Sequence, residues 1–459
     1  MTQEPVADLP LSASPRAPEV EGPEAGAGQA AEQIAAERKR RGWVIDTRPL
    51  RVLAYRRMWI GNGVSFFGFQ FTSVAVPVQM FAITNSSAWV GLLGIAGLVP
   101  LLIFGLWGGA AADVVDRRRL LLASSTLTWL ATVGFLAQAL AGVNSAILLL
   151  ALTAVQSAGF AISSPARQAI IPRIVPADLV PAANTLAYTT TTAGGVLGPL
   201  AAGLIFAGYS TGAGVVVAYL VDVGLFTVTF WATYRLPPIP PVIAELGVPR
   251  PTAGVRGIVD GLRYLVTKPV LLLSFAVDII AMVFAMPRAL FPEVAQDRFG
   301  GGAAVGWLFS AIALGSVVGG LTSGWIGHVR RQGVALVLAV VAWGVAVGVA
   351  GLAPSLWLMV ALLAVGGAAD LVSAVYRQSI LQTYAPDRLR GRLQGVFTVV
   401  VAGGPRLGDL RAGATAGITG ATASWAGGGF LAAALAIVLG SVFPALLRYQ
   451  PPKEPSGTG

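Results

Sequence analysis

The stretch Gly109–Arg119 reads GAAADVVDRRR and lies between two long apolar segments. An acid followed by consecutive arginines at this place predicts a tight polar turn at a membrane surface, where the charges can hold two helices together or release them. The glycine at its start permits close contact between helices. A less complete copy begins 210 residues later, at Gly319, and ends with Arg330 and Arg331. Two similar halves are typical of secondary transporters.

The composition places the chain in a membrane. Of its 459 residues, 55% are hydrophobic and only 11% are charged, and the mean hydropathy is +0.73. A soluble protein carries about 25% charged residues. The formal net charge of +10 comes from short basic runs between apolar segments, which is typical of cytoplasmic loops rather than of a nucleic-acid surface. We therefore expect a multi-pass protein of the cell membrane, surrounded by membrane lipid and without a nucleic-acid partner.

Few residues are available for cofactor or metal chemistry. The chain has no cysteine and a single histidine, His328, which excludes disulfides, thiolate chemistry and multi-imidazole metal sites. None of its three lysines belongs to a phosphate-binding loop, which argues against an ATP-driven pump. We expect no cofactor, no metal site, no catalytic residues and no enzyme activity.

Twelve apolar segments are long enough to cross a hydrocarbon core of about 30 Å. They run roughly over 59–83, 89–112, 120–141, 146–165, 183–208, 214–234, 270–291, 303–326, 334–353, 356–379, 394–419 and 425–447. Basic residues gather in the loops after every second span, whereas the loops after the first, third, fifth, ninth and eleventh spans contain neither lysine nor arginine. This alternation and the even number of spans predict that both termini are cytoplasmic.

These segments divide the chain into five parts. They are a disordered cytoplasmic tail over 1–55, a six-helix bundle over 56–235, a cytoplasmic linker over 236–268, a second six-helix bundle over 269–448 and a cytoplasmic tail over 449–459. The first tail is polar and lacks an apolar core. Prolines between Pro237 and Pro241 stop the sixth helix, and Gly257–Val266 is predicted to form a short amphipathic helix.

The internal repeat keeps a constant offset over a long segment. A shift of 210 residues places Arg167 on Arg377 and Gly203 on Gly413, with further matches between them. The two halves are therefore predicted to have the same topological sense and to be related by an axis along the membrane normal.

On these features the chain resembles the major facilitator superfamily over nearly all of residues 55–450. The residues that match its loop hallmark between the second and third spans are Gly109, Asp113, Arg117 and Arg118. The chain departs from the hallmark at Val114, where an arginine is usual, and at Asp116, where a glycine is usual. The resemblance implies a major facilitator fold, and it implies that the matching acid and arginines form a charge cluster that gates transport.

A second motif lies in the fifth span and is formed by Gly194, Gly198, Pro199 and Gly203. It resembles the antiporter motif of the superfamily's exporters. Pro199 removes a backbone donor and bends the helix, while the small residues permit close packing. An ordinary glycine-rich packing face remains the alternative. The segments 57–59, 176–186 and 386–395 resemble the subgroup of enterobactin exporters and macrolide-efflux proteins.

Ionisable residues also lie inside the predicted spans, at Asp222, Asp278, Asp370, Arg377, Arg406, Asp409 and Arg411. An unpaired charge near the bilayer centre costs about 2.5–3.5 kcal/mol, so these side chains should face the interior and pair. The spacing places Asp370 and Arg377 on one helix face and lets Arg406 and Asp409 pair, whereas Arg411 needs a partner from another helix. Two interpretations remain open: a network that couples protons to transport and orients the substrate, or a fixed set of interhelical ion pairs.

Polar and aromatic side chains alternate along the first span. Asn62, Ser65, Phe69 and Ser73 follow helical spacing and are predicted to line a central cavity, although helix packing would also explain them. Amide, hydroxyl and aromatic groups together suit a large amphipathic ligand.

The sequence thus predicts an all-α membrane protein with 12 transmembrane helices in two six-helix pseudo-repeats. We expect a monomeric, proton-coupled antiporter that exports a hydrophobic or amphipathic small molecule, such as a siderophore or a drug, by alternating access. The alternatives are an importer or facilitator of a small solute, and a lipid-handling or scaffold protein without transport activity.

Overall fold

The computed structural model describes residues 46–235, 262–386 and 389–450. Side chains at 106, 108–114, 165, 166, 168, 169 and 390–392 are outside this description. The predicted tails up to residue 45 and from 451 onward, and the linker over 236–261, are also outside it. Of the predicted helix over 257–266, the described part, 262–266, is helical. In the described residues every regular element is a helix.

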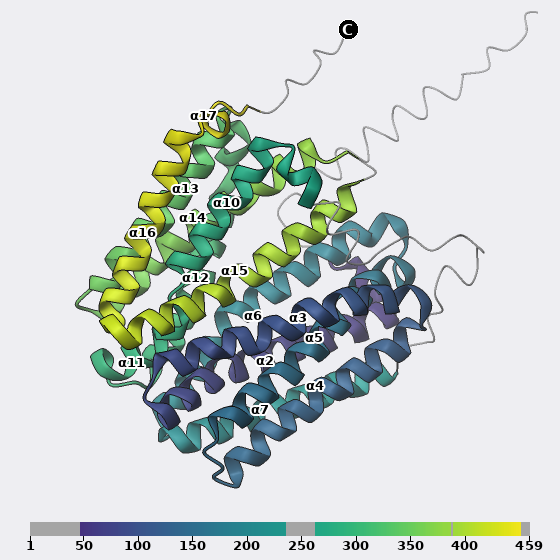
Figure 1. Cartoon of the computed structure of the whole chain (residues 1–459). Helices are drawn as coiled ribbons and strands as arrows, with labels where there is room; N and C mark the ends of the chain where they lie inside the picture. The colour runs from purple at the N-terminus through teal and green to yellow at the C-terminus, as the bar shows by residue number, and fades with distance from the viewer. Residues whose placement is uncertain (1–45, 236–261, 387–388, 451–459) are drawn as a thin grey trace, which may run out of the picture. The chain divides into compact units, whose positions relative to one another are not determined.

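The described helices form two groups that follow each other along the chain (Figure 1). The first group contains α2 (Leu53–Thr84), α3 (Ser87–Val114), α4 (Arg117–Leu140), α5 (Ala146–Ile174), α6 (Val180–Gly208) and α7 (Thr211–Tyr234). The second group contains α10 (Pro269–Ala285), α12 (Ala303–Leu321), α13 (Gln332–Leu352), α14 (Leu356–Tyr384), α15 (Arg390–Thr419) and α16 (Ala421–Val442). Short elements join them: η1 (Arg48–Arg51), η2 (Ala177–Leu179), η3 (Arg288–Leu290), α11 (Phe291–Phe299), η4 (Ser323–His328) and α17 (Pro444–Leu447).

Among the described residues, 11 helices are long and apolar enough to cross a membrane. In the bilayer core every backbone group must bond within its own segment, which is why long apolar segments fold as helices. The remaining long helix, α15, carries Arg406, Asp409 and Arg411, and these charges lower its hydropathy. With α15 included, the predicted all-α membrane fold of twelve crossings is confirmed.

The seventh predicted span, 270–291, ends earlier than expected. Helix α10 stops at Ala285, and Met286 has an extended backbone with φ −81° and ψ 114°. The cause is Pro287, because a proline disfavours the α conformation of the residue before it and cannot continue the helical bonding. The chain then forms η3 and the short helix α11 before α12 begins.

The two groups repeat each other's geometry, which confirms the pseudo-repeat. A shift of 210 residues takes Ala146–Ile174 of α5 onto Leu356–Tyr384 of α14. The same shift takes Val180 and Gly208, the bounds of α6, to 390 and 418, and α15 runs from Arg390 to Thr419.

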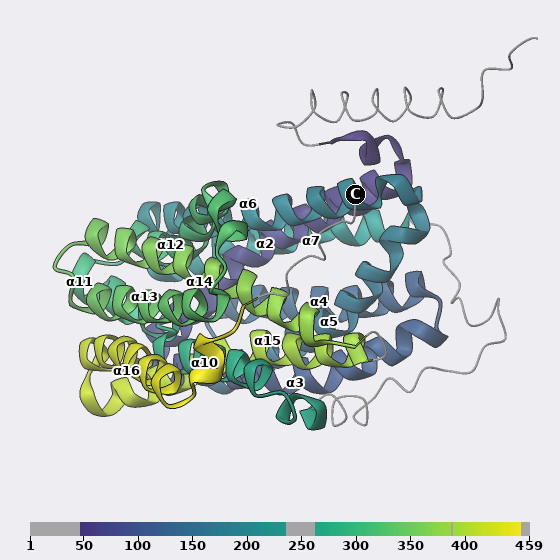
Figure 2. The same ribbon diagram turned by 90° about the horizontal axis from the view of Figure 1, so that it is seen from above.

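Two pairs of helices join the halves: α3 packs against α15, and α6 packs against α12 (Figure 2). At each seam, backbone meets backbone at a glycine. A β-carbon added to Gly203 of α6 would lie 2.7 Å from Cα of Gly306 in α12. The closest contacts lie toward the ends of α6 and α15 that are remote from Leu53, where α2 begins, and from Leu447, where α17 ends. We call this end of the molecule the sealed end, defined by Ser87, Gly203, Gly306 and Gly413.

Candidate functional site

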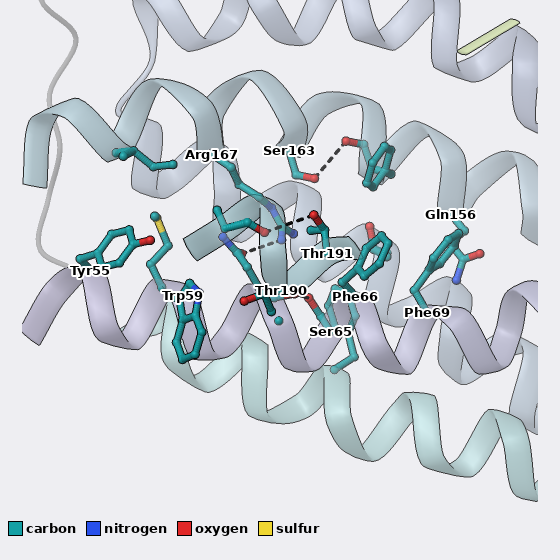
Figure 3. A pocket seen from close by; sticks show the side chains of 18 residues that line it. Tyr55, Trp59, Ser65, Phe66, Phe69, Gln156, Ser163, Arg167, Thr190 and Thr191 are labelled. Atoms are coloured by element: carbon teal, nitrogen blue, oxygen red, sulfur yellow. Dashed lines mark hydrogen bonds between the residues drawn. The ribbon is translucent and has the colours of Figure 1, made fainter. Parts of the chain in front are cut away.

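A cavity of about 250 Å³ lies within the first half. It runs along α2 from Tyr55 to Phe69, and α5 and α6 supply most of its opposite wall (Figure 3). Six aromatic side chains line it, from Tyr55, Trp59, Phe66, Phe69, Phe160 and Phe226. Polar groups are interspersed among them, including Asn62, Ser65, Gln156, Ser163, Thr190 and Thr191. The cavity therefore offers flat apolar surfaces together with hydrogen-bonding groups, as ligand pockets commonly do.

Arg167 is the single charged residue among the described residues that line this cavity. It projects from α5 between the aromatic groups at the two ends of the cavity (Figure 3). Its Nη1 donates a hydrogen bond of 2.7 Å to Oδ1 of Asn62 in α2. Its Nε is buried and has no hydrogen-bond partner among the described residues. Among the described residues the guanidinium is thus tied to α2 through Asn62, and its buried Nε keeps an unused hydrogen-bond donor beside the cavity.

The structure places the predicted cavity residues as follows. Asn62, Ser65 and Phe69 line the cavity, whereas Ser73 lies beyond it and donates to the Gln70 carbonyl at 2.9 Å. Helical spacing on α2 was sufficient to find the first three. The groups contributed by α5 and α6 come from distant parts of the chain, and no local pattern on α2 points to them.

The antiporter-like motif on α6 faces two different neighbours. Gly194 and Gly198 lie against Phe66 and Gln70 of α2. Further along, the Pro199 carbonyl and Gly203 lie against Gly306 of α12. Ser310 of α12 donates to the Val196 carbonyl at 2.9 Å. The motif therefore lies between the cavity helix and the seam with the second half.

Asp222 ties α7 to α2. Its side chain is buried, and Thr72 donates to its Oδ2 at 2.5 Å. Its other carboxyl oxygen has no hydrogen-bond partner among the described residues. Gly68 lies directly against the carboxyl group, so the absence of a side chain there lets the two helices approach.

In the second half, Arg377 of α14 lies between two acids. It forms an ion pair with Asp278 of α10, and its Nη2 lies 3.7 Å from Oδ1 of Asp370. The side chains of Asp278 and Arg377 are 3% and 4% exposed, whereas that of Asp370 is 30% exposed. Asp370 is therefore the member of this cluster that reaches accessible space.

Asp409 of α15 belongs to a second part of the same charge network. Its Oδ1 accepts a hydrogen bond of 3.2 Å from the backbone N–H of Ala289 in η3. Asp409 interacts electrostatically with Arg288 and Arg406, and Arg288 also interacts with Asp370. The sequence did not single out Arg288, because the early end of α10 at Pro287 could not be located from hydropathy.

Arg411 has a different environment from its neighbours on α15. It donates to the carbonyls of Val283 and Phe284 at the end of α10 and to the carbonyl of Ser424 in α16. The Val283 and Phe284 carbonyls lie in the last turn of α10, where carbonyls lack intrahelical donors and a cation faces the negative end of the helix dipole. Arg411 thus joins three helices through their backbones.

The predicted gating cluster is described in part. Gly109 and Asp113 lie in the last turns of α3, whose side chains fall outside the described residues. Arg117 is buried at the start of α4. Arg118 donates to the Tyr234 carbonyl at 2.7 Å and lies over the Tyr234 ring. The described contacts of Arg118 therefore link α4 to α7 within the first half.

At the sealed end, α11 bridges the halves. Glu293 accepts a hydrogen bond from Ser87, the first residue of α3. A carboxylate at this position also faces the positive end of the α3 dipole. Arg298 holds α11 to its own half through the Gly351 carbonyl and the Thr422 hydroxyl.

The amino-acid sequence matches a membrane-protein family and is similar to named exporters. Residues 46–453 match the family described as transmembrane secretion effector. The enterobactin exporter EntS of Citrobacter koseri is 28% identical over 427 residues, covering 91% of this chain and 99% of the relative. EntS of Escherichia coli O157:H7 is 27% identical over 430 residues, covering 92% and 100%.

Solved structures with the same fold include transporters of several kinds. The nucleoside transporter NupG superposes with a TM-score of 0.68 at 15% identity, covering 86% of this chain and 100% of that one. A bacterial homologue of the iron transporter ferroportin in an inward-facing state superposes with a TM-score of 0.66 at 14% identity, covering 87% and 99%. At these identities the likeness concerns the fold alone.

Proposed function

The chain belongs to the transmembrane secretion effector family of major facilitator transporters, and on this premise we propose that it exports an amphipathic aromatic molecule in exchange for protons. As a member of this family it is a multi-pass transporter of the cell membrane with a small-molecule substrate, and it is not an enzyme. Direction, cargo and driving ion are the proposed parts.

The proposed cargo follows from the chemistry of the cavity. Aromatic walls favour flat apolar groups by stacking, and the charged guanidinium of Arg167, which lines the cavity, favours an anionic or hydroxyl-bearing group beside them. A siderophore with aromatic rings and acidic hydroxyls has this combination. The name of the relatives, enterobactin exporter, supports the same class of cargo.

The proposed direction rests on the charge of the loops and on the seams. The positive-inside rule supports cytoplasmic termini, which puts the sealed end on the outer side. Because the cavity begins near Tyr55, at the N-terminal end of α2, cargo would enter it from the cytoplasm. Rocking of the two halves against each other would then open the path to the outer side and release the cargo there, as in other transporters built from repeats. We propose that a monomer carries out this cycle, because one chain supplies both halves.

The observation that carries proton coupling is the position of Asp370. Its carboxyl group is partly exposed in the middle of a membrane helix and lies 3.7 Å from a buried arginine that a second acid also contacts. A carboxyl group with access to solvent can exchange a proton, and the competition between two acids for one guanidinium links that proton to the helix packing.

Efflux into inverted membrane vesicles tests the proposal. With enterobactin and a macrolide as probes, uptake should require a proton gradient with the vesicle lumen acidic, so that protons leave the lumen as the probe enters, and it should be independent of ATP. Asp278→Asn, Asp370→Asn and Asp409→Asn should each abolish uptake driven by the proton gradient, because each variant removes the proton site or its partner. Normal gradient-driven transport by all three variants would reject proton coupling at these residues. Transport in the opposite direction would favour the importer.

Arg167→Gln provides a separate test of the cargo site. A hydrogen bond to a charged group is worth about 1.5–3 kcal/mol, so the apparent KM for an acidic aromatic probe should rise about 10- to 150-fold while proton coupling persists. The matched control is Arg298→Gln, since Arg298 bonds the Gly351 carbonyl and the Thr422 hydroxyl in the second half, outside the cavity. Measuring KM for enterobactin in proteoliposomes decides this. An unchanged KM in Arg167→Gln would remove this arginine from the cargo site.

A further inference from the structure

Arg288 lies in a segment whose other residues are buried. Its side chain is exposed, whereas Ala289 and Leu290, the next two residues of η3, are 2% and 0% exposed. The helix break at Pro287 creates this arrangement, because a continuous α10 would direct position 288 along the helix surface instead. An arginine that keeps access to solvent within a membrane bundle is expensive to retain and is usually functional.

The charge of this arginine acts on two acids from different helices, without an ion pair within 4.0 Å among the described residues. Asp370 of α14 and Asp409 of α15 both interact electrostatically with Arg288. The backbone next to Arg288 also holds Asp409 directly, through the 3.2 Å bond from the Ala289 N–H. Arg288 therefore links the partly exposed Asp370 to Asp409.

The remaining charged groups around this arginine complete a balanced set. Asp278 pairs with Arg377, whose Nη2 lies 3.7 Å from Oδ1 of Asp370. The charge of Arg406 acts on Asp409. Among the described residues the cluster thus holds the acids Asp278, Asp370 and Asp409 and the bases Arg288, Arg377 and Arg406. One proton added to this cluster leaves one guanidinium without its carboxylate, and that guanidinium must find another partner or more water.

The cluster borders the seam between the halves. Element η3 packs against both α15 and α3. A β-carbon added to Gly91 of α3 would lie 2.6 Å from the backbone oxygen of Asp409, and Gly97 lies close to the Arg406 guanidinium. A change in the pairing of Asp409 therefore acts on the place where α3 and α15 touch.

We propose that Arg288 is a positioning residue that transmits protonation of Asp409 to Asp370 and to the α3–α15 seam. Protonation of the Asp409 carboxylate removes one of the two negative charges that act on Arg288; Arg288 then moves toward Asp370 and weakens the interaction of Asp370 with Arg377. The inference rests on the proposed proton coupling and adds the residue by which the proton would act on the packing of the halves.

The test separates cargo movement from proton movement. Purified Arg288→Gln, Arg288→Lys and wild-type protein are reconstituted in liposomes that contain a pH-sensitive dye, with enterobactin as the probe. Arg288→Gln should retain enterobactin counterflow at equal pH, lose enterobactin-driven proton movement and show a flattened pH profile. Arg288→Lys should restore all three. Arg298→Gln is the matched control. Arg298 lies in the same connection between α10 and α12, but among the described contacts it bonds only the Gly351 carbonyl and Thr422. This variant should keep the wild-type ratio of protons to cargo.

The proton-to-cargo ratio and the enterobactin counterflow of the Arg288 variants decide the inference. A wild-type proton-to-cargo ratio in Arg288→Gln overturns the inference and leaves the proposed function standing. Loss of counterflow in folded Arg288→Gln and Arg288→Lys alike also overturns it, because the arginine would then be needed for packing. Enterobactin transport without proton movement by the wild-type protein rejects both the proposed coupling and the inference.

Discussion

Arg377→Leu is expected to be the most destabilising single change in the membrane core. Asp278 would be left 2% exposed without its guanidinium partner. Removing one member of a buried ion pair costs about 3–5 kcal/mol, because the remaining charge has neither water nor a partner. Tryptophan fluorescence during thermal unfolding in detergent measures the loss, and transport should disappear with it.

A double variant distinguishes this cause from simple loss of packing. Asp278→Asn combined with Arg377→Leu removes both buried charges and should recover most of the stability, since the remaining acid, Asp370, is 30% exposed and keeps access to water. It should still fail to couple transport to a proton gradient. If Arg377→Leu alone unfolded at the wild-type temperature, the ion pair would contribute nothing to the fold.

Gly203→Leu is expected to have the largest effect on the transport cycle. The first carbon of any side chain there would lie 2.7 Å from Cα and 3.0 Å from the backbone nitrogen of Gly306. Backbone cannot yield as a flexible side chain can, and such overpacking costs about 1–3 kcal/mol. The protein should exchange between a conformation in which the sealed end is closed and one in which it is open. Gly203→Leu should shift this equilibrium about 5- to 150-fold toward the open conformation, with a matching loss of transport.

The absence of native cysteine makes this shift directly measurable. Spin labels on Asn85→Cys and Gln296→Cys, which line a small cavity at the sealed end, should report longer distances in Gly203→Leu than in the parent. Gly195→Ala is the control on the same helix, because a β-carbon there would have its nearest neighbour at 4.0 Å, at Ala313. Equal label distances in Gly203→Leu and the parent would show that this seam does not set the conformation.

The fold could be predicted from the sequence because a bilayer permits few alternatives. Long apolar segments must be helices, and the constant offset that pairs Arg167 with Arg377 predicts the repeat from the sequence alone. The residues at which the spans end are harder to predict from the sequence. Hydropathy carried the seventh span to residue 291, whereas the backbone constraint of Pro287 ends α10 at Ala285.

The candidate site was predictable only where one helix supplies it. Spacing on α2 identified Asn62 and Phe69, but the bond between Asn62 and Arg167 joins residues 105 positions apart. Nothing in local sequence specifies such a pairing. Arg288 was missed for a related reason: its neighbourhood depends on a helix break and on two acids contributed by α14 and α15.

The aromatic cavity is lined by described residues between Tyr55 and Phe226, whereas the acid–arginine cluster lies between Asp278 and Asp409. With the proposed roles of the two sites, such a division would let natural variation in the first half alter the cargo while the proposed proton-coupling cluster in the second half is inherited unchanged. Hybrids that join the first half of one relative to the second half of another should therefore follow the first parent in selectivity and the second in energy source.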